Sequence, residues 1–242
     1  MINLGLIGFG RFGQFAARHL RSHVHLFVWD MRDYRKKAAS LGLTWGTLEE
    51  AASCQVVLLA VPVSEMSAAL AQVVPFLRPG AILMDACSVK MMPVEWMKAA
   101  APPEVEVIGA HPLFGPRSGR SGIGGLTVVL CPARTSRADV IRRFLQGLGL
   151  KVVISTPEEH DRQMAWAQAL THFVARGLVA AGVREQELMT PTFERLLRVI
   201  EPLARENPKL YRDMHQYNPW AVDLRVRLMD ALRALDAEVQ AE

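Results

Sequence analysis

The sequence predicts a doubly wound α/β domain built on a mostly parallel sheet, followed by an all-helical second domain. In the first part of the 242-residue chain, short β-branched runs alternate with amphipathic stretches, which is the pattern of a parallel sheet covered by helices on both faces. Glycine, on which turns depend, is concentrated in this part, and only two of the 17 glycines lie beyond Gly149. Half of the residues are apolar, which is enough to bury a sizeable core.

The predicted elements of the first domain follow from these runs. Strands are expected over residues 3–7, 24–29, 55–61, 81–85, 105–109, 126–130 and 152–154, with helices over 12–20, 48–52, 65–77, 94–101 and 137–148. We place the end of the domain near Ser155, because Thr156 supplies an N-cap and Pro157 suits the first position of a helix. The predicted domains are therefore 1–155 and 156–242.

The second domain should consist of helices over residues 156–181, 193–205, 208–217 and 219–239. The last of these carries an apolar stripe with the spacing of a helix that packs against another helix. The stripe consists of Leu224, Leu228, Leu232, Leu235 and Val239. We therefore predict a homodimer that forms through the helical domain.

Composition excludes several classes of protein. The net charge is +4, but no dense basic run indicates a nucleic-acid partner, and a mild positive charge suits a small anionic substrate. No apolar stretch is long enough to cross a membrane and no signal sequence is visible, so we expect a soluble, cytoplasmic protein. The cysteines Cys54, Cys87 and Cys131 lack the spacing of a disulfide framework or metal site, so we expect no metal and three small buried side chains.

A glycine motif marks a dinucleotide site of the Rossmann type. The first strand runs directly into Gly8-Phe-Gly10-Arg-Phe-Gly13, which opens a helix. Gly8 permits the tight turn, Gly10 allows a pyrophosphate to approach the backbone, and Gly13 allows helix and strand to pack closely. The helix N-terminus then faces the phosphates. The expected cofactor contacts are Gly8, Phe9, Gly10, Arg11, Phe12, Gly13, Asp30, Arg32, Val61 and Pro62.

The residue after the second strand bears on the choice of cofactor. Asp30 lies where an acid accepts hydrogen bonds from a ribose 2′-hydroxyl, and its charge repels a 2′-phosphate, which favours NAD over NADP. Arg32, Arg35 and Lys36 follow directly, and basic residues at this place hold the extra phosphate in NADP-binding proteins. NADP therefore stays open as the second choice.

Ligands of doubly wound sheets bind beyond the carboxyl ends of the strands. Two segments with polar or ionisable side chains occupy such positions. They are Ala86-Cys-Ser88-Val-Lys90 and Ala110-His111-Pro-Leu-Phe-Gly-Pro116. Histidine is the side chain whose ordinary pKa suits a general base near neutral pH, and the following proline restricts its backbone. His111 and Ser88 are accordingly the candidate catalytic residues.

At these residues the sequence resembles the prephenate/arogenate dehydrogenase family of tyrosine biosynthesis. The resemblance extends over nearly the whole chain in family order. Its blocks are Asp85-x-x-Ser88-Val89-Lys90, His111-Pro-Leu-Phe-Gly-Pro116, Glu159-His160-Asp161, Gln168-Ala-Leu-Thr-His172-Phe173 and Asn207-Pro208-x-Leu210-Tyr211-x-Asp213.

The resemblance implies a single chemistry. A ring hydroxyl carbon loses hydride to NAD, and the carboxylate on the para carbon leaves as carbon dioxide because the ring becomes aromatic. His111 would accept the hydroxyl proton and Ser88 would hydrogen-bond the hydroxyl. Neither a metal nor a covalent nucleophile is required. Prephenate and arogenate differ by a keto against an amino group, and the sequence leaves the choice open.

The helical half supplies the candidate substrate-binding residues. Gln168 and His172 lie one turn apart on one helix, and in the resemblance this face lines the substrate pocket. The neighbouring pair His160-Asp161 is interpreted as capping the helix rather than as catalytic.

The pattern departs from the family where a carboxylate clamp is expected. Bacterial bifunctional relatives place an arginine directly after the aromatic residue of this segment, whereas this chain has Glu194 after Phe193, an order closer to plant arogenate dehydrogenases. Because arginine binds a carboxylate through two parallel hydrogen bonds, we choose Arg195. Arg198 is the first substitute, followed by Arg117 and Arg120.

Two other interpretations stay open. One is another two-domain hydroxy-acid dehydrogenase, although such enzymes often use a lysine in the helical domain, where this chain has only Lys209. The other is a catalytically silent NAD-binding dimer, which would bind cofactor without turnover. Since no additional domain is visible at either end of the sequence, we expect a single activity.

Overall fold

The computed structural model describes residues 1–241. The chain divides into two compact units, one from Met1 to His160 and one from Asp161 onward, and each is described by itself. Within the described part of the chain, no helix combines the length and apolarity that crossing a membrane would require.

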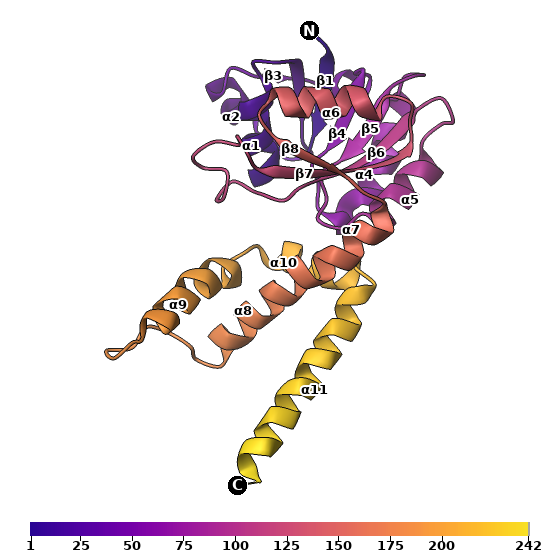
Figure 1. Ribbon diagram of the computed structural model, residues 1–242. Coiled ribbons are helices and arrows are strands. Elements are labelled where there is room, and N and C mark those ends of the chain that lie inside the picture. Colours follow the sequence, from indigo (N-terminus) through magenta and orange to yellow (C-terminus); the bar gives the residue numbers. More distant parts are fainter. Residues whose placement is uncertain (242) are drawn as a thin grey trace. The chain divides into compact units, whose positions relative to one another are not determined.

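The first unit is built on an eight-stranded sheet with strand order β3-β2-β1-β4-β5-β6-β7-β8 (Figure 1). Neighbouring strands run parallel except β6 and β7, which pair antiparallel. The strands are β1 (Asn3–Ile7), β2 (His25–Trp29), β3 (Thr44–Trp45), β4 (Val56–Leu59), β5 (Ile82–Asp85), β6 (Glu106–Pro112), β7 (Thr127–Arg134) and β8 (Lys151–Ile154). The carboxyl ends of β1, β4, β5 and β6 therefore lie at one edge of the sheet, which confirms the predicted fold class.

Helices connect the strands and cover the sheet. They are α1 (Arg11–Leu20), α2 (Arg35–Ser40), α3 (Leu48–Ala52), α4 (Met66–Val73), α5 (Met91–Ala100) and α6 (Ala138–Gly147), with short 3₁₀ turns at Val63–Glu65 and Val74–Phe76. Helix α3 begins with the capping box of Thr47 and Glu50, in which each side chain accepts a hydrogen bond from the other residue's backbone N–H.

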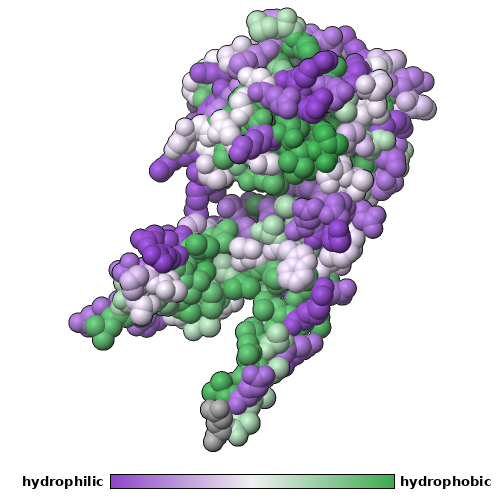
Figure 2. All heavy atoms as spheres, in the orientation of Figure 1, coloured by the Kyte–Doolittle hydropathy of each residue, from purple (hydrophilic) through white to green (hydrophobic). Residues whose placement is uncertain are grey.

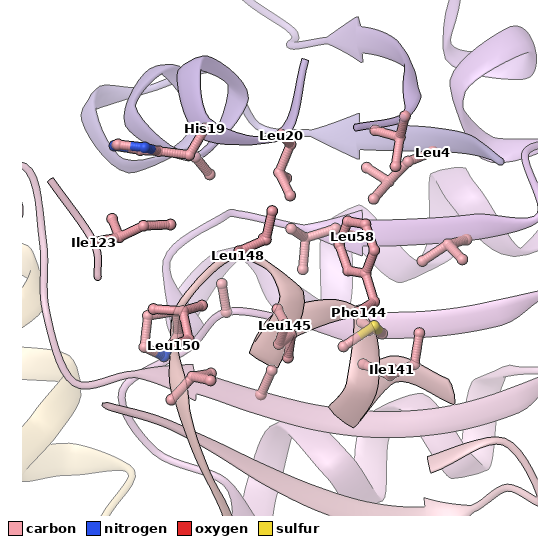
Figure 3. Close-up of a pocket in the computed structure, with 18 of the residues that line it drawn as sticks. Leu4, His19, Leu20, Leu58, Ile123, Ile141, Phe144, Leu145, Leu148 and Leu150 are labelled. Atoms are coloured by element: carbon pink, nitrogen blue, oxygen red, sulfur yellow. The ribbon is translucent and has the colours of Figure 1, made fainter. Parts of the chain in front are cut away.

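A cavity of about 140 Å³ lies between α1 and α6 on one face of the sheet (Figure 3). Its lining is almost wholly apolar and includes Leu20 of α1, Phe144 of α6 and Leu58 of β4. Ala110 and Pro112 also line this cavity. Because successive side chains of a strand point to opposite faces, His111 between them is directed to the other face. The cavity is therefore separate from the candidate catalytic histidine.

The second unit is helical, and its elements are α7 (Pro157–Met164, which begins in the first unit), a π-helical segment (Ala165–Leu170), α8 (Thr171–Ala180), α9 (Pro191–Ala204), α10 (Pro208–Gln216) and α11 (Trp220–Gln240). Thr156 caps α7 as predicted, because its Oγ1 accepts a hydrogen bond from Glu159 N at 3.1 Å. Helices α8 and α9 pack together through Ala175, Leu197 and Ile200. Only the first turns of α11 are buried, at Ala221 and Leu224.

Three expectations from the sequence need correction. The short strand β3 and the helix α2 were not predicted, since two and six residues are too few for a periodic pattern. The helix expected over 156–181 contains the π-helical turn at Ala165–Leu170. His111 lies inside β6 rather than after it, because β7 pairs with it as far as Pro112. The three cysteines are buried, as predicted.

We predict that Gly5→Ala lowers the free energy of unfolding by about 3 kcal/mol. A Cβ at Gly5 would lie 1.7 Å from the backbone oxygen of Ala51, so β1 and α3 would have to separate. The matched control is Gly147→Ala in α6, where a Cβ meets nothing within 4 Å. The control should raise stability by about 0.5 kcal/mol. Urea denaturation measures both, and equal effects of the two variants would contradict the packing described here.

Candidate functional site

The glycine turn has the close packing that its sequence predicts. Gly8 has a φ of 98°, and a Cβ there would lie 2.6 Å from the backbone oxygen of Ala60 and 3.0 Å from Cγ1 of Val61. A Cβ at Gly13 would lie 2.0 Å from the oxygen of Gly8. The first strand, the first helix and the end of β4 can therefore approach this closely only because these positions are glycine.

Gly10 differs from its neighbours because a Cβ there would meet nothing within 4 Å. It is the N-cap of α1, and no side chain caps this helix. The first N–H groups of α1 and the positive end of its dipole therefore face open space, which is the arrangement that binds a phosphate group. The turn fits the pyrophosphate of a dinucleotide.

Asp30 follows β2 and is fixed by the same turn. Its Oδ2 accepts a hydrogen bond from Phe9 N at 2.6 Å, and its Oδ1 accepts one from Arg32 N at 2.8 Å. Each carboxylate oxygen keeps a further lone pair, so the group can still accept hydrogen bonds from a ribose. The side chains of Arg11 and Arg32 are exposed.

The two aromatic residues of the turn have different positions. The Phe9 ring is fully buried and makes edge contacts with Tyr34 and Trp45, with ring centroids 6.1 and 6.2 Å apart. Phe12 lines the apolar cavity beside Phe15. The contribution of Phe9 to a bound ligand is therefore confined to its backbone, while Val61 lies against Gly8 and Pro62 is exposed.

A buried ion pair joins the ends of β5 and β6. Asp85 and Lys90 are fully buried, and the Lys90 ammonium donates to Oδ2 of Asp85. The same ammonium donates to the carbonyl of Ala110 at 2.7 Å, while Ala110 N donates to Oδ1 of Asp85 at 3.1 Å. Both backbone groups of Ala110 are thus held, and so is the residue that follows it. A Cβ at Gly109 would lie 3.2 Å from Cδ of Lys90, so this position leaves space for the lysine stem.

His111 is buried, with 4% of its surface exposed, and its Nδ1 lies 2.8 Å from Nε2 of His160. Burial, and then the nearby His160 and Lys90, hold the pKa of His111 well below its ordinary value of 6.5. The imidazole is therefore neutral at physiological pH. If its Nδ1–H donates to His160, its Nε2 carries the lone pair that a proton acceptor needs. The interpretation of His160 as a helix cap is wrong, because Thr156 caps α7 and the His160 side chain contacts His111.

Ser88 follows β5 and is buried, and its Oγ has no hydrogen-bond partner among the described residues. Buried hydroxyl groups are rarely left unpaired, and exceptions commonly mark binding or catalytic positions. Ser88 and His111 come from the adjacent parallel strands β5 and β6, at the edge of the sheet that also carries the glycine turn. The predicted catalytic pair and the predicted cofactor turn therefore share this edge.

The helical unit contains a second group of polar side chains, two of them buried and two half-buried. Gln168, His172, Arg176 and His215 each have a buried polar atom without a hydrogen-bond partner among residues 1–241. The first two were predicted from the sequence, whereas Arg176 and His215 were missed. Arg176 could have been found from its spacing, since it lies one turn after His172 on the same helix.

The arginines chosen from the sequence lie elsewhere. Arg195 and Arg198 are exposed on α9, whose buried side is formed by Leu197 and Ile200. Arg117 and Arg120 are exposed in the first unit. None of the four belongs to the polar group around His172. Asp161 is buried, and its carbonyl accepts a hydrogen bond from Asn218 at 2.7 Å.

Fold and site together define a dinucleotide-binding α/β unit with a helical second unit, and comparison with known proteins agrees. The family model described as prephenate dehydrogenase, nucleotide-binding domain, matches residues 16–154. The model described as prephenate dehydrogenase, dimerization domain, matches residues 156–241. The chain belongs to the prephenate dehydrogenase family.

Individual relatives are similar over most of the chain. A probable arogenate/prephenate dehydrogenase of Methanocaldococcus jannaschii is 30% identical over 86% of this chain and 50% of its own length. Arogenate dehydrogenase 2 of Arabidopsis thaliana is 30% identical over 98% of this chain and 70% of its own length. The chain thus spans between half and about two thirds of these two relatives.

Solved structures show the same fold. The prephenate dehydrogenase of Aquifex aeolicus, in complex with hydroxyphenyl propionate and NAD⁺, has a TM-score of 0.78 at 22% identity, covering 100% of this chain and 93% of that one. The arogenate dehydrogenase of Synechocystis has a TM-score of 0.73 at 22% identity, covering 99% and 93%.

We predict that Lys90→Met lowers the free energy of unfolding by about 3–5 kcal/mol, because it leaves the Asp85 carboxylate buried without its cation. The double variant Asp85→Asn with Lys90→Met should recover most of that loss. Lys98→Met is the matched control, since Lys98 pairs with Glu95 at an exposed position, and its effect should stay below about 0.5 kcal/mol. Chemical denaturation measures all three. A Lys90 variant as stable as the control would exclude the structural role of the pair.

Proposed function

We propose that this protein is an NAD-dependent oxidoreductase that carries out the oxidative decarboxylation of prephenate, arogenate or both. The observation that carries the proposal is the neutral, buried His111, held by His160 and by the Asp85–Lys90 pair, with the unpartnered hydroxyl of Ser88 following the adjacent strand. Family membership and the named activities of the relatives support it.

His111 acts as the proton acceptor. As hydride leaves the ring hydroxyl carbon, the hydroxyl becomes the acidic O–H of a forming ketone, so even an imidazole of low pKa can take its proton. His160 fixes the tautomer by accepting from Nδ1, as an orienting group does in a catalytic triad. The Oγ of Ser88 hydrogen-bonds the same hydroxyl. The bond between the ring and the carboxylate then breaks, and carbon dioxide leaves. The electron pair of that bond completes the aromatic ring, and the carbonyl oxygen takes the proton back from His111 as it becomes the phenol.

NAD supplies the hydride acceptor when bound. The N–H groups at the start of α1 and the backbone at Gly10 hold its pyrophosphate, and Asp30 accepts hydrogen bonds from its ribose. The carboxylate of Asp30 lies where a 2′-phosphate would carry like charge, which supports NAD over NADP. The Aquifex aeolicus relative forms a complex with hydroxyphenyl propionate and NAD⁺. This complex supports NAD as the cofactor and a substrate with a six-membered ring.

The protein acts as a homodimer, which the match to a dimerization domain supports. On α11, Leu232, Leu235 and Val239 of the predicted stripe are each at least half exposed, at 50%, 56% and 79%. Figure 2 shows this apolar surface along α11 and along the pair α8 and α9. Exposed apolar stripes of this length are typical of helices that pack against a second chain. The cytoplasmic location expected from the sequence is part of the same proposal.

The activity is tested with purified protein, both substrates and both dinucleotides, by the absorbance of the reduced cofactor. We predict turnover with NAD. We also predict that His111→Asn, which keeps a polar side chain of similar length but removes the basic nitrogen, loses at least about 100-fold in kcat. Asn cannot accept a proton at this pH. Binding of NAD without turnover on either substrate would instead favour the silent dimer, and turnover of an unrelated hydroxy acid would favour the other dehydrogenase.

The lowered pKa of His111 sets the pH dependence. We predict that kcat/KM of the wild-type protein does not fall as the pH drops through 6.5, because His111 stays neutral until the pH reaches its lowered pKa. The contribution of His111 to stability behaves differently, because the unfolded chain binds the proton at a higher pH than the folded chain. This contribution is fully present above pH 6.5 and is lost as the pH falls toward the pKa of His111 in the folded state. An acid limb of kcat/KM centred at the ordinary histidine pKa would contradict the burial of this side chain.

We predict that light scattering finds twice the chain mass of 26.9 kDa, and that Leu232→Asp shifts the protein toward a monomer. An aspartate on this stripe places a charge in an apolar interface. Arg233→Gln is the control, because Arg233 is exposed and pairs with Asp230 on the surface at 2.8 Å. A wild-type monomer, or a Leu232 variant that remains as dimeric as the control, would overturn the proposed interface.

A further inference from the structure

Four polar side chains of the helical unit, each with a buried polar atom, form what we call the α8–α10 polar cluster, which consists of Gln168, His172, Arg176 and His215. The Arg176 guanidinium stacks on Tyr211, with Cζ 4.3 Å from the ring centroid, and Tyr211 in turn contacts His215 at 4.6 Å between centroids. Nη2 of Arg176 donates to the carbonyl of Glu206 at 2.7 Å. These contacts fix the guanidinium, yet no carboxylate pairs with it among the residues that the structure describes.

Two atoms of the cluster are hydrogen-bond donors. Nη1 of Arg225 lies 2.8 Å from Nδ1 of His215, and because a guanidinium only donates, Nδ1 accepts. Burial and the nearby Arg225 lower the pKa of His215 to about 4, so the ring is neutral and carries its proton on Nε2. Nε2–H of His215 and Nε–H of Arg176 are both buried without an acceptor. Buried donors and cations require a partner, and these two suit an anion.

The other two atoms are acceptors. One ring nitrogen of His172 makes a hydrogen bond to the backbone at Leu203 that favours the protonated ring, so this nitrogen donates to the carbonyl. Burial nevertheless lowers the pKa of His172, which leaves the ring neutral and Nδ1 with a lone pair. Nδ1 of His172 and Oε1 of Gln168 are buried without a donor. The half-buried Glu206 lies close enough to act on His172 electrostatically. This side of the cluster suits a positively charged donor.

A single chemical group provides partners for both the two donors and the two acceptors. An α-amino acid carries a carboxylate, which accepts, on the carbon that carries an ammonium, which donates. An α-keto acid carries the same carboxylate, but its keto oxygen only accepts, so the acceptors of Gln168 and His172 would stay unpaired. Sites built to hydrogen-bond a substrate group reject analogues that lack that group, because their own buried polar atoms are then left without partners.

We propose that the α8–α10 polar cluster recognises the α-amino-acid end of the substrate, with Arg176 and His215 on the carboxylate and Gln168 and His172 on the ammonium. This rests on the proposed function, and it selects arogenate over prephenate as the substrate. It adds Arg176 as the arginine that binds the α-carboxylate, whereas Arg195, the sequence-based choice for a carboxylate clamp, is exposed on α9.

The first test compares kcat/KM on L-arogenate and on prephenate with NAD. We expect at least about 100-fold preference for arogenate. Gln168→Leu should reduce kcat/KM on arogenate at least tenfold and change the value on prephenate by less than about threefold. Gln168→Glu keeps an acceptor and should retain the preference. A wild-type ratio near one, or equal losses on both substrates in Gln168→Leu, overturns the proposal.

The second test concerns the carboxylate. Arg176→Gln should raise KM for both substrates at least tenfold, because both carry this carboxylate. Arg205→Gln is the matched control, since Arg205 is exposed and pairs with Glu201 on the surface. Loss of substrate binding in Arg195→Gln, with Arg176→Gln unaffected, overturns the assignment. Urea denaturation of each variant identifies any that fail to fold, and Arg176→Lys, which keeps the charge, should then recover part of the binding.

A binding measurement separates this proposal from the proposed function. L-Tyrosine carries the same amino-acid end as arogenate, and 4-hydroxyphenylpyruvate carries the same keto-acid end as prephenate. Calorimetry measures the binding of both compounds without turnover. We expect tighter binding of L-tyrosine in the wild-type protein and loss of that difference in Gln168→Leu. If neither substrate is oxidised, the proposed function fails. The calorimetry then decides the amino-acid site by itself, and equal binding of the two compounds overturns it.

Discussion

The buried pair of Asp85 and Lys90 is the constraint on which the candidate site depends. It spans two strand ends and satisfies both backbone groups of Ala110, so the backbone cannot rotate to carry the next side chain elsewhere. A buried ion pair contributes little net stability when compared with well-packed apolar residues, yet it fixes geometry strictly because neither partner can be left alone. Here that geometry holds a neutral histidine at the edge of the sheet.

Unpaired polar atoms indicate function in both units. In the first unit the Ser88 hydroxyl is buried without a partner near the strand end that carries His111, and in the second the α8–α10 polar cluster has two donors and two acceptors without partners. Folded proteins pair nearly all of their buried polar groups. Orphans gathered in small groups therefore indicate a ligand, and the type of each atom describes that ligand's chemistry. The apolar cavity between α1 and α6 gives no such indication (Figure 3).

The sequence predicted the sheet, the glycine turn and His111, because these depend on local patterns. Strand periodicity and the Gly8 turn are short-range features, and the cap at Thr156 is set by three residues. It did not predict the contact of His160 with His111, since that contact joins residues 49 positions apart. Arg176 was missed because charge alone does not distinguish an arginine with a buried Nε from an exposed one such as Arg195.

The central claim is that His111 is a neutral imidazole whose tautomer is set by its neighbours. Nitrogen-15 NMR of histidine-labelled protein, titrated between pH 8 and 5, measures this directly, and a His111→Asn sample assigns the signals. The account predicts a His111 ring that stays neutral across this range, with its proton on Nδ1 and none on Nε2. A ring that titrates near its ordinary pKa of 6.5, or that carries its proton on Nε2, would contradict it.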